Sequence, residues 1–194
     1  MTEQADDRHT ILIAEDEPLA SMALRAQLEA LDYRVLGTAR DGSEAVLLGT
    51  CFPIDIGLFD LRMPAMNGLD AAHELFRIAP TPVVLLTGFG PADLPDPIPL
   101  PPIFATLSKP VGLGDLNTGL SRAYSAFIDW YETEDDRAHR VRRSRDDRTL
   151  IGRAVDRLAA DSSTLTAAAR IVQRARDRGR PLVDVARDIL REEP

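Results

Sequence analysis

The sequence predicts an α/β protein in which a doubly wound, five-stranded parallel sheet is followed by a long helix and a small three-helix bundle. Three observations carry this prediction. Short apolar runs alternate with segments of helical periodicity up to about residue 113, which is the pattern of a doubly wound sheet. The apolar runs lack polar alternation, as is typical of strands buried on both faces. From residue 114 onward the pattern is helical only.

Five apolar runs are the predicted strands, at residues 10–14, 33–39, 54–60, 82–87 and 103–108. Helices are predicted at residues 19–31, 43–48 and 68–78. A further helix is expected before the fifth strand, but residues 90–102 read GPADLPDPIPLPP and hold six of the chain's 14 prolines. Because a proline inside a helix costs about 3 kcal/mol, we expect a proline-rich loop to replace the fourth helix.

Polar residues stand at the ends of four predicted strands, and they are Glu15 and Asp16, Asp60, Thr87, and Lys109. In an open parallel sheet, ligands bind outside the carboxyl ends of the strands, so these side chains are expected to meet. Three carboxylates repel one another unless a hard cation lies between them, and Mg²⁺ prefers such oxygen ligands. A lysine and a threonine beside them suit a phosphoryl group bonded to an aspartate.

Four motifs within residues 10–124 resemble the receiver domain of two-component response regulators in type, order and spacing: ILIAEDEP, DLRMPAMNG, VVLLTG and LSKP. The resemblance implies that Asp60 is the phosphoacceptor, that Thr87 and Lys109 contact the phosphoryl oxygens, and that a sensor histidine kinase is the partner. The implied magnesium ligands are Asp16, Asp60 and the backbone carbonyl of Arg62, with Glu15 assisting. The protein is then no enzyme beyond self-catalysed phosphotransfer and autodephosphorylation. The alternative is an inactive domain with solvated carboxylates.

The segment around the fourth strand resembles one branch of receivers. Most receivers carry an aromatic residue three positions before the lysine, where this chain has Thr106, and Phe104 is the next residue on that face by period-two counting. The motif LLTGFG and the prolines after it are similar to the FATGUY branch, whose fourth helix is shortened or mobile and whose usual partners are HWE-type kinases. This similarity implies that a loop ordered by phosphorylation transmits the state of Thr87.

The predicted domain boundaries are a disordered N-terminus at residues 1–9, a receiver at 10–124, a connecting helix at 125–146 and a helical output domain at 147–194. The helix predicted from residue 114 continues beyond the end of the receiver, and it carries four aromatic residues there: Tyr124, Phe127, Trp130 and Tyr131. They fit two alternatives: a coil through which the protein forms a homodimer, or packing on the chain's own second domain.

Residues 147–192 have the pattern of three short helices, and they resemble the ANTAR domain, an RNA-binding module that promotes transcription antitermination. The similar motifs are LIGRAVDRL, AAARIV and ARDRGRPLVDVA, while Ala168 and Val172 depart from the residues that the family often has. RNA binding requires cations that neutralise phosphates, and the candidates are Arg153, Arg157, Arg170, Arg174 and Arg178. The segment has no aromatic residue for base stacking. The alternative is a solvated helix face on which these arginines pair with acids.

Composition limits the remaining functions. The net charge of −8 belongs to the first part of the chain, because residues 1–128 hold 17 acids and 8 bases, whereas residues 137–180 hold 13 arginines and 5 acids. Such a basic segment attracts phosphates. One cysteine excludes an internal disulfide, the three histidines form no zinc motif, and no apolar run reaches the ~20 residues of a membrane span. We therefore expect a cytoplasmic protein without membrane contact.

The leading hypothesis is a response regulator phosphorylated on Asp60 that binds structured RNA and promotes antitermination. The alternative is a phosphorylation-dependent adaptor whose helical tail binds a protein partner or dimerises. A DNA-binding output is less consistent with the sequence, because the bundle lacks a clear helix-turn-helix turn.

Overall fold

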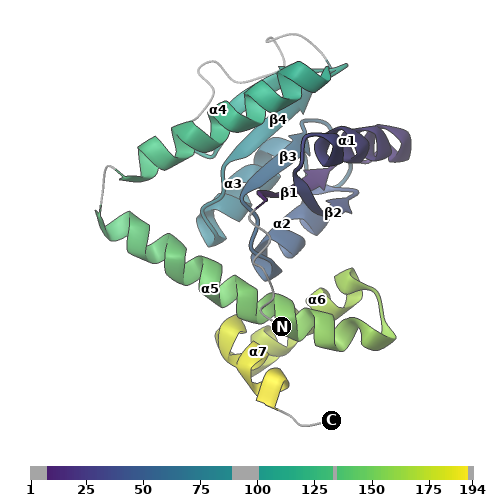
Figure 1. Ribbon diagram of the computed structural model, residues 1–194. Helices are drawn as coiled ribbons and strands as arrows, with labels where there is room; N and C mark the ends of the chain where they lie inside the picture. The colour runs from purple at the N-terminus through teal and green to yellow at the C-terminus, as the bar shows by residue number, and fades with distance from the viewer. Residues whose placement is uncertain (1–7, 89–100, 133–134, 192–194) are drawn as a thin grey trace, which may run out of the picture.

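The computed structural model describes residues 8–88, 101–132 and 135–191, and it confirms the predicted fold class (Figure 1). Five parallel strands form one sheet in the order β2-β1-β3-β4-β5. The strands are β1 (Thr10–Ala14), β2 (Arg34–Ala39), β3 (Ile56–Asp60), β4 (Val83–Thr87) and β5 (Ile103–Ser108). The helices that cover the sheet are α1 (Pro18–Ala30), α2 (Gly42–Cys51), α3 (Gly68–Ile78) and α4 (Leu113–Glu132). The predicted proline-rich loop lies outside the described residues, apart from residues 101 and 102.

The strand predictions agree with the structure to within two residues at each end. Every residue of β1, β3 and β4 is buried, as the absence of polar alternation predicts. The less buried strands are β2 and β5, which lie at the two edges of the sheet. The three central strands therefore form a fixed platform whose carboxyl ends carry the candidate site.

Alternate residues of the central strands build two hydrophobic cores, one on each face of the sheet. Leu12, Phe59 and Leu85 belong to the core shared with α2 and α3. Their neighbours Ile13 and Leu58 belong to the core shared with α1 and α4. This division follows from the two-residue period of side chains along a strand.

The aromatic residues of α4 pack on the sheet and on α3. Phe127 lies 5.5 Å from Phe104 of β5 and 6.5 Å from Phe76 of α3, measured between ring centroids. Trp130 lies 5.5 Å from Phe76, and Tyr131 lies 5.4 Å from Phe127. These rings thus extend the sheet domain, a packing that differs from the alternative in which they pack on a second domain. A homodimer through this helix stays a prediction.

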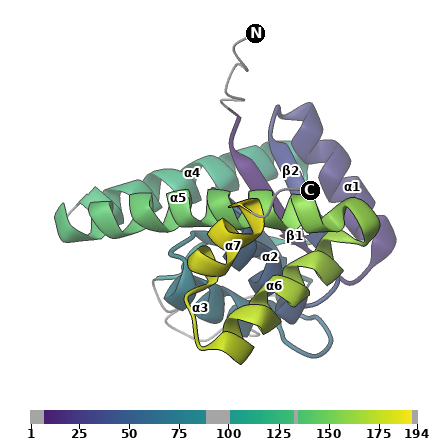
Figure 2. The same cartoon turned by 90° about the horizontal axis from the view of Figure 1, so that it is seen from below.

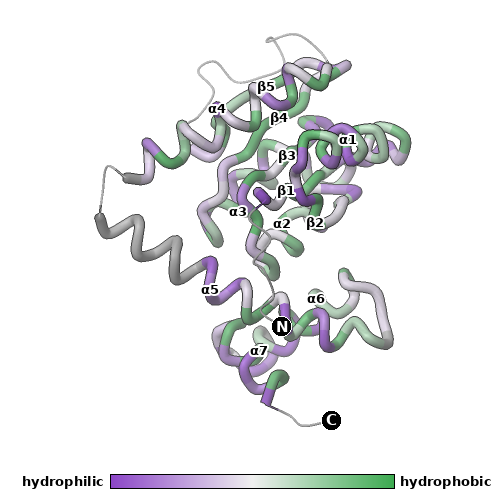
Figure 3. The backbone as a smooth tube through the Cα atoms, viewed as in Figure 1, coloured by the Kyte–Doolittle hydropathy of each residue, from purple (hydrophilic) through white to green (hydrophobic). Residues whose placement is uncertain are grey.

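Residues 135–191, called the tail below, contain α5 (Asp135–Leu158), a 3-10 turn η2 (Ala159–Asp161), α6 (Thr164–Arg178) and α7 (Leu182–Arg191). Figure 2 shows α6 and α7 packed against α5 on one side of the molecule. In Figure 3 the coloured part of α5 begins hydrophilic, and hydrophobic residues then alternate with hydrophilic ones where it meets these helices. The buried apolar residues of all three helices join the same core as α2.

The predicted boundary between connecting helix and output domain, at residues 146 and 147, lies inside α5. The connecting helix expected at residues 125–146 corresponds to the end of α4 and the start of α5. The first helix of the predicted bundle is the second half of this same α5. Of the N-terminus predicted to be disordered, residues 1–7 lie outside the described residues, while the His9 ring lies 4.3 Å from that of Tyr124. The domain boundaries themselves stay predictions.

Among the described helices, none has the length and apolar character needed to cross a membrane.

Candidate phosphoacceptor and magnesium site

Three carboxylates meet at the carboxyl edge of the sheet. Glu15 and Asp16 follow β1, and Asp60 is the last residue of the adjacent strand β3. Because parallel strands end at the same edge, one carboxylate oxygen from each residue lies within 4.8 Å of the others. Glu15 and Asp60 are buried, whereas Asp16 is exposed. The structure therefore brings together the three predicted carboxylate ligands, with one side open to solvent.

Lys109 neutralises the buried part of this cluster. Its Nζ lies 2.6 Å from Oε2 of Glu15 and 3.0 Å from Oδ2 of Asp60. Burial lowers the pKa of Lys109, but its hydrogen bonds to Glu15 and Asp60 and its attraction to both carboxylates outweigh this effect, so the pKa lies above its ordinary value. Lys109 is thus held as a fixed positive charge beside Asp60.

The remaining predicted site residues lie around the cluster. Thr87 ends β4 and is buried, and its carbonyl accepts a hydrogen bond from the backbone N–H of Lys109 at 2.7 Å. This bond extends the β4–β5 ladder and places the lysine alongside the threonine. Arg62 lies two residues beyond Asp60, and its side chain is exposed. The roles of Thr87 and of the Arg62 carbonyl as ligand contacts stay predictions.

Gly68, which was not predicted to belong to the site, packs against the backbone of Asp60. The backbone N–H of Gly68 donates to the carbonyl of Leu61 at 3.1 Å, where α3 begins. A Cβ atom at position 68 would overlap the carbonyl oxygen of Asp60. The available sequence signal is the dipeptide Asn67–Gly68, in which Asn67 caps α3 by accepting from the N–H of Asp70 at 2.8 Å. Gly68 thus permits α3 to approach the end of β3 closely.

Replacing Gly68 with alanine is expected to lower the free energy of unfolding by about 1–3 kcal/mol, because α3 and the end of β3 must separate. Urea denaturation measures the effect. The matched control is Gly112→Ala, where the added Cβ meets no atom closer than 3.5 Å. Equal denaturation midpoints for the two variants would show that this close approach is not structurally important.

An apolar cavity of about 480 Å³ adjoins the cluster and was not predicted from the sequence. It is lined by Glu15, Ala20, Ala23, Leu24, Gln27, Leu86, Gly88, Lys109, Pro110 and Val111. Its walls come from α1 and from the segment after β5, so residues about 90 positions apart in the chain form it. The cavity gives the charged site an apolar side.

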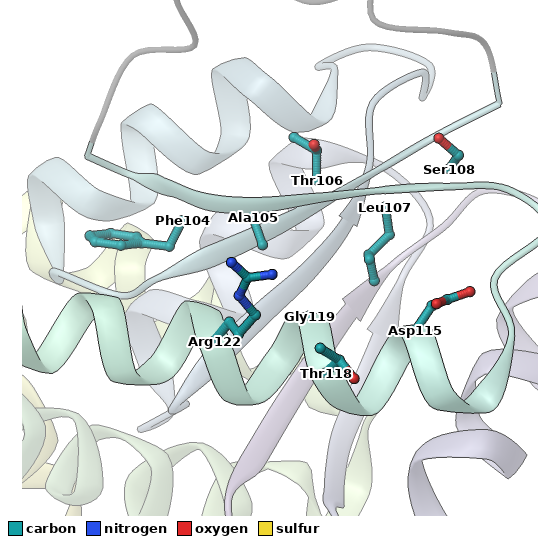
Figure 4. A pocket seen from close by; sticks show the side chains of 9 residues that line it. All are labelled: Phe104, Ala105, Thr106, Leu107, Ser108, Asp115, Thr118, Gly119 and Arg122. Atoms are coloured by element: carbon teal, nitrogen blue, oxygen red, sulfur yellow. The ribbon is translucent and has the colours of Figure 1, made fainter.

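A second cavity, of about 540 Å³, lies between the edge strand β5 and α4. In Figure 4, Leu107 points toward α4 and Thr106 points away from it. Thr106, at the position where most receivers carry an aromatic residue, is exposed. Phe104 lies 5.5 Å from Phe127 and 6.2 Å from Trp130, ring centroid to ring centroid, and is thus part of the aromatic packing on α4.

The five candidate RNA-binding arginines lie on two helices of the tail. Arg153 and Arg157 are exposed on α5, and Nη1 of Arg157 donates to the carbonyl of Leu190 at 3.2 Å. Three more follow at four-residue steps on α6, which places them on one side of that helix: Arg170, Arg174 and Arg178. Of these three, only Arg174 is half-buried.

The family model of the response regulator receiver domain matches residues 11–120, more than half of the chain. The protein belongs to this family. The receiver comprises the sheet, its helices and the charged site, and the match ends within α4, before the tail begins.

Curated relatives align with about three fifths of this chain. The transcriptional regulatory protein PdtaR of Mycobacterium tuberculosis is 38% identical over 117 residues, which is 60% of this chain and 57% of PdtaR. The phyllosphere-induced regulator PhyR of Methylorubrum extorquens is 33% identical over 125 residues, 61% of this chain and 45% of PhyR. The chain thus spans about half the length of these relatives.

Solved structures of receiver domains match a similar share of this chain. The receiver domain of a modulated diguanylate cyclase from Desulfovibrio desulfuricans is 29% identical with a TM-score of 0.54, and the match covers 63% of this chain and 98% of that one. The receiver domain of a sensor histidine kinase from Pseudomonas aeruginosa, which holds a magnesium ion in its active-site cleft, is 27% identical with a TM-score of 0.54 over 61% and 98% of the two chains.

Proposed function

We propose that this protein is a response regulator that accepts a phosphoryl group on Asp60 from a sensor histidine kinase. The observation that carries the proposal is the joint presence of a buried aspartate, two neighbouring carboxylates and a lysine ammonium 3.0 Å from the aspartate at the carboxyl edge of the sheet. A nucleophilic carboxylate and a fixed cation side by side suit transfer of an anionic group. An HWE-type kinase is the proposed donor, because LLTGFG resembles the FATGUY branch.

The cluster fits a magnesium ion, because its oxygen donors converge and one of the three carboxylates remains open to solvent. The proposed ligands are Asp16, Asp60 and the carbonyl of Arg62, with Glu15 assisting. The magnesium ion in the active-site cleft of the similar Pseudomonas aeruginosa receiver supports magnesium as the bound ion. The bound ion would supply positive charge that offsets repulsion between the Asp60 carboxylate and the phosphoryl oxygens.

The residues of the chain perform the other parts of the transfer. An oxygen of Asp60 forms the new bond to phosphorus while the bond from phosphorus to the donor imidazole nitrogen breaks. Lys109, already beside Asp60, donates to a phosphoryl oxygen and neutralises its charge. The Thr87 hydroxyl donates to a second phosphoryl oxygen. The site thus stabilises an aspartyl phosphate.

Incubation with acetyl phosphate is expected to add one phosphoryl group in the presence of Mg²⁺ and none in the presence of EDTA. Asp16→Asn is expected to raise the Mg²⁺ concentration required by about tenfold or more, because it removes a charged ligand. Intact-mass spectrometry measures the labelled fraction. Asp129→Asn, an exposed aspartate on α4, is the matched control. Equal labelling with EDTA and with Mg²⁺ would contradict the magnesium assignment.

For the output we infer that the tail binds structured RNA and promotes antitermination. The resemblance to the ANTAR domain supports this inference, as does the row of Arg170, Arg174 and Arg178 along one side of α6. Substitution of two arginines of this row, measured by RNA retention at two salt concentrations, tests it.

A second candidate function is that of a phosphorylation-dependent adaptor whose tail binds a protein partner. One observation favours it: residues 147–194 contain no aromatic ring on which an unpaired base could stack. In addition, Arg180 and Arg187 are engaged with acids of the tail itself, Asp188 at 2.5 Å and Asp184 at 2.8 Å. RNA retention by the phosphorylated protein separates the two functions.

A further inference from the structure

The tail contacts the receiver at the edge of the sheet opposite Asp60, and an ion pair anchors this contact. Nη1 of Arg145 on α5 lies 2.5 Å from Oδ1 of Asp55, which directly precedes β3. The Asp55 side chain is only 5% exposed, and its other oxygen accepts from the N–H of Thr10 at 2.7 Å. One buried carboxylate thus joins the amino-terminal ends of two strands to the tail.

A second arginine enters the receiver one helical turn further along α5. Arg148 is 4% exposed, and its Nη1 donates to the carbonyl of Gly49 at 3.3 Å and to Oγ1 of Thr81 at 3.4 Å. Burial, and next the charge of Arg145, lower the pKa of Arg148 to about 10, while Asp55 raises it. Docking therefore removes a cation from water, which costs free energy that the contacts with α2 and with the segment before β4 must offset.

A weaker attraction acts further along α5. Asp156, eleven residues after Arg145, is exposed, and its pKa is raised by partial burial and lowered in part by Arg34, which is also exposed at the start of β2. Solvent screens charges of this kind, so Arg145 and Arg148 are the charged residues that anchor α5 to the receiver.

The contact between the tail and the receiver is both apolar and charged. Ile151, Ala154 and Val155 of α5 share one buried core with α2, and beside it an open groove of about 350 Å³ lies between β2, α2 and the tail. The buried charges of Asp55 and Arg148 lose their hydration when α5 docks, which reduces the net free energy that holds the tail on the receiver.

We propose that the contact of α5 with the receiver is a reversible ionic latch, closed by Arg145 and Arg148 and opened when a polyanion captures these two arginines. The closed latch buries the guanidinium group of Arg148 and pairs that of Arg145 with Asp55, so a phosphate that takes both groups must compete with these receiver atoms. Arg153 lies two turns beyond Arg145 on the same helix and is exposed. RNA bound there would compete with Asp55 for Arg145. The opening by RNA rests on the RNA-binding function proposed above, whereas the latch itself does not.

The chain contains a natural probe for this opening, its single cysteine. Cys51 ends α2, is fully buried, and belongs to the hydrophobic core that α2 shares with the tail. Gly152 of α5 packs against it so closely that an added Cβ would lie 3.4 Å from the Cys51 carbonyl oxygen and 2.9 Å from a ring carbon of Phe52. Burial raises the pKa of the Cys51 thiol to about 12, so a thiol reagent at neutral pH reacts chiefly with the open form.

Labelling of Cys51 in the full-length protein with a chromogenic disulfide reagent tests the latch. Arg145→Gln and Asp55→Asn are each expected to speed labelling at least about tenfold, because Arg145→Gln leaves the buried Asp55 carboxylate without its counter-ion and Asp55→Asn removes the charge that holds Arg145. Arg145→Lys, which retains the charge, is expected to fall between Arg145→Gln and the parent. Asp146→Asn, exposed on the same helix, is the matched control and is expected to leave the rate unchanged. Far-UV circular dichroism shows whether each variant folds. If Asp55→Asn misfolds, Arg145→Gln still tests the latch, because its substitution lies in the tail and leaves the receiver sequence unchanged.

Unchanged labelling in Arg145→Gln would overturn the latch. Addition of a hairpin RNA pool is expected to speed labelling of the parent and to have little further effect on Arg145→Gln. If RNA is retained on the protein without faster labelling, opening by RNA is wrong while RNA binding stands. If no RNA is retained, the RNA-binding function fails, opening by RNA fails with it, and the rates of the variants still decide whether the latch exists.

Discussion

Replacement of Lys109 with alanine is expected to lower the rate of phosphoryl transfer to Asp60 at least about hundredfold, the range seen when one preorganised donor is removed from a reacting oxyanion. The Nζ of Lys109 lies 3.0 Å from Asp60 and 2.6 Å from Glu15. Without it, the two buried carboxylates lose the ammonium group that contacts both of them, and the incoming phosphoryl group loses a fixed cation beside Asp60. The rate of acetyl phosphate labelling at saturating Mg²⁺ measures the loss.

The same variant is expected to unfold more easily, by roughly 1–3 kcal/mol, because Glu15 and Asp60 remain buried without their counter-ion while the lysine is itself partly exposed. Added Mg²⁺ is expected to restore part of this stability. Lys109→Arg is the control: it retains the charge and most of the stability, yet its planar guanidinium does not reproduce the compact ammonium, so labelling stays low. Labelling of Lys109→Ala at the parent's rate would contradict the role assigned to the lysine.

Replacement of Arg174 and Arg178 with glutamate is expected to abolish RNA retention by the phosphorylated protein. The two residues are four apart on α6 and therefore lie on the same side of the helix. Each lost contact with a single-strand phosphate should also reduce the slope of log binding against log salt by ~0.7. Filter retention of a hairpin RNA pool at two salt concentrations measures both effects.

The matched control changes two exposed arginines of the receiver, Arg40→Glu with Arg122→Glu, which alters the net charge equally. We expect this variant to retain more RNA than the α6 variant at both salt concentrations. If the phosphorylated parent retains no RNA even at low salt, the antitermination function is wrong and the adaptor function replaces it.

The strands and their site could be predicted because the signals are local. A buried parallel strand needs an unbroken apolar run, and β1, β3 and β4 each have one. The carboxyl ends of parallel strands share one edge, so the sequence alone places Asp60 beside Glu15. Lys109 follows from the same rule, since the β4–β5 ladder continues to its backbone.

The packing of the later helices could not be predicted, because their partners lie far away in the sequence. The periodicity of α4 indicated an apolar stripe, but nothing near Phe127 or Trp130 identifies Phe76 as the ring they contact. Likewise, Arg145 and Asp55 are separated by 90 positions, and each alone has the pattern of a solvated charge. The helical pattern of α5 fades between its two halves, which led to a predicted boundary inside one continuous helix.

The position of the phosphoryl group tests the central claim most directly. After labelling with acetyl phosphate and Mg²⁺, borohydride reduction converts an aspartyl phosphate to homoserine, and tandem mass spectrometry of the peptides locates the change. We predict homoserine at position 60 in the parent and none in Asp60→Asn. Homoserine at another aspartate, or labelling of Asp60→Asn at the parent's level, would contradict the assignment of Asp60 as the phosphoacceptor.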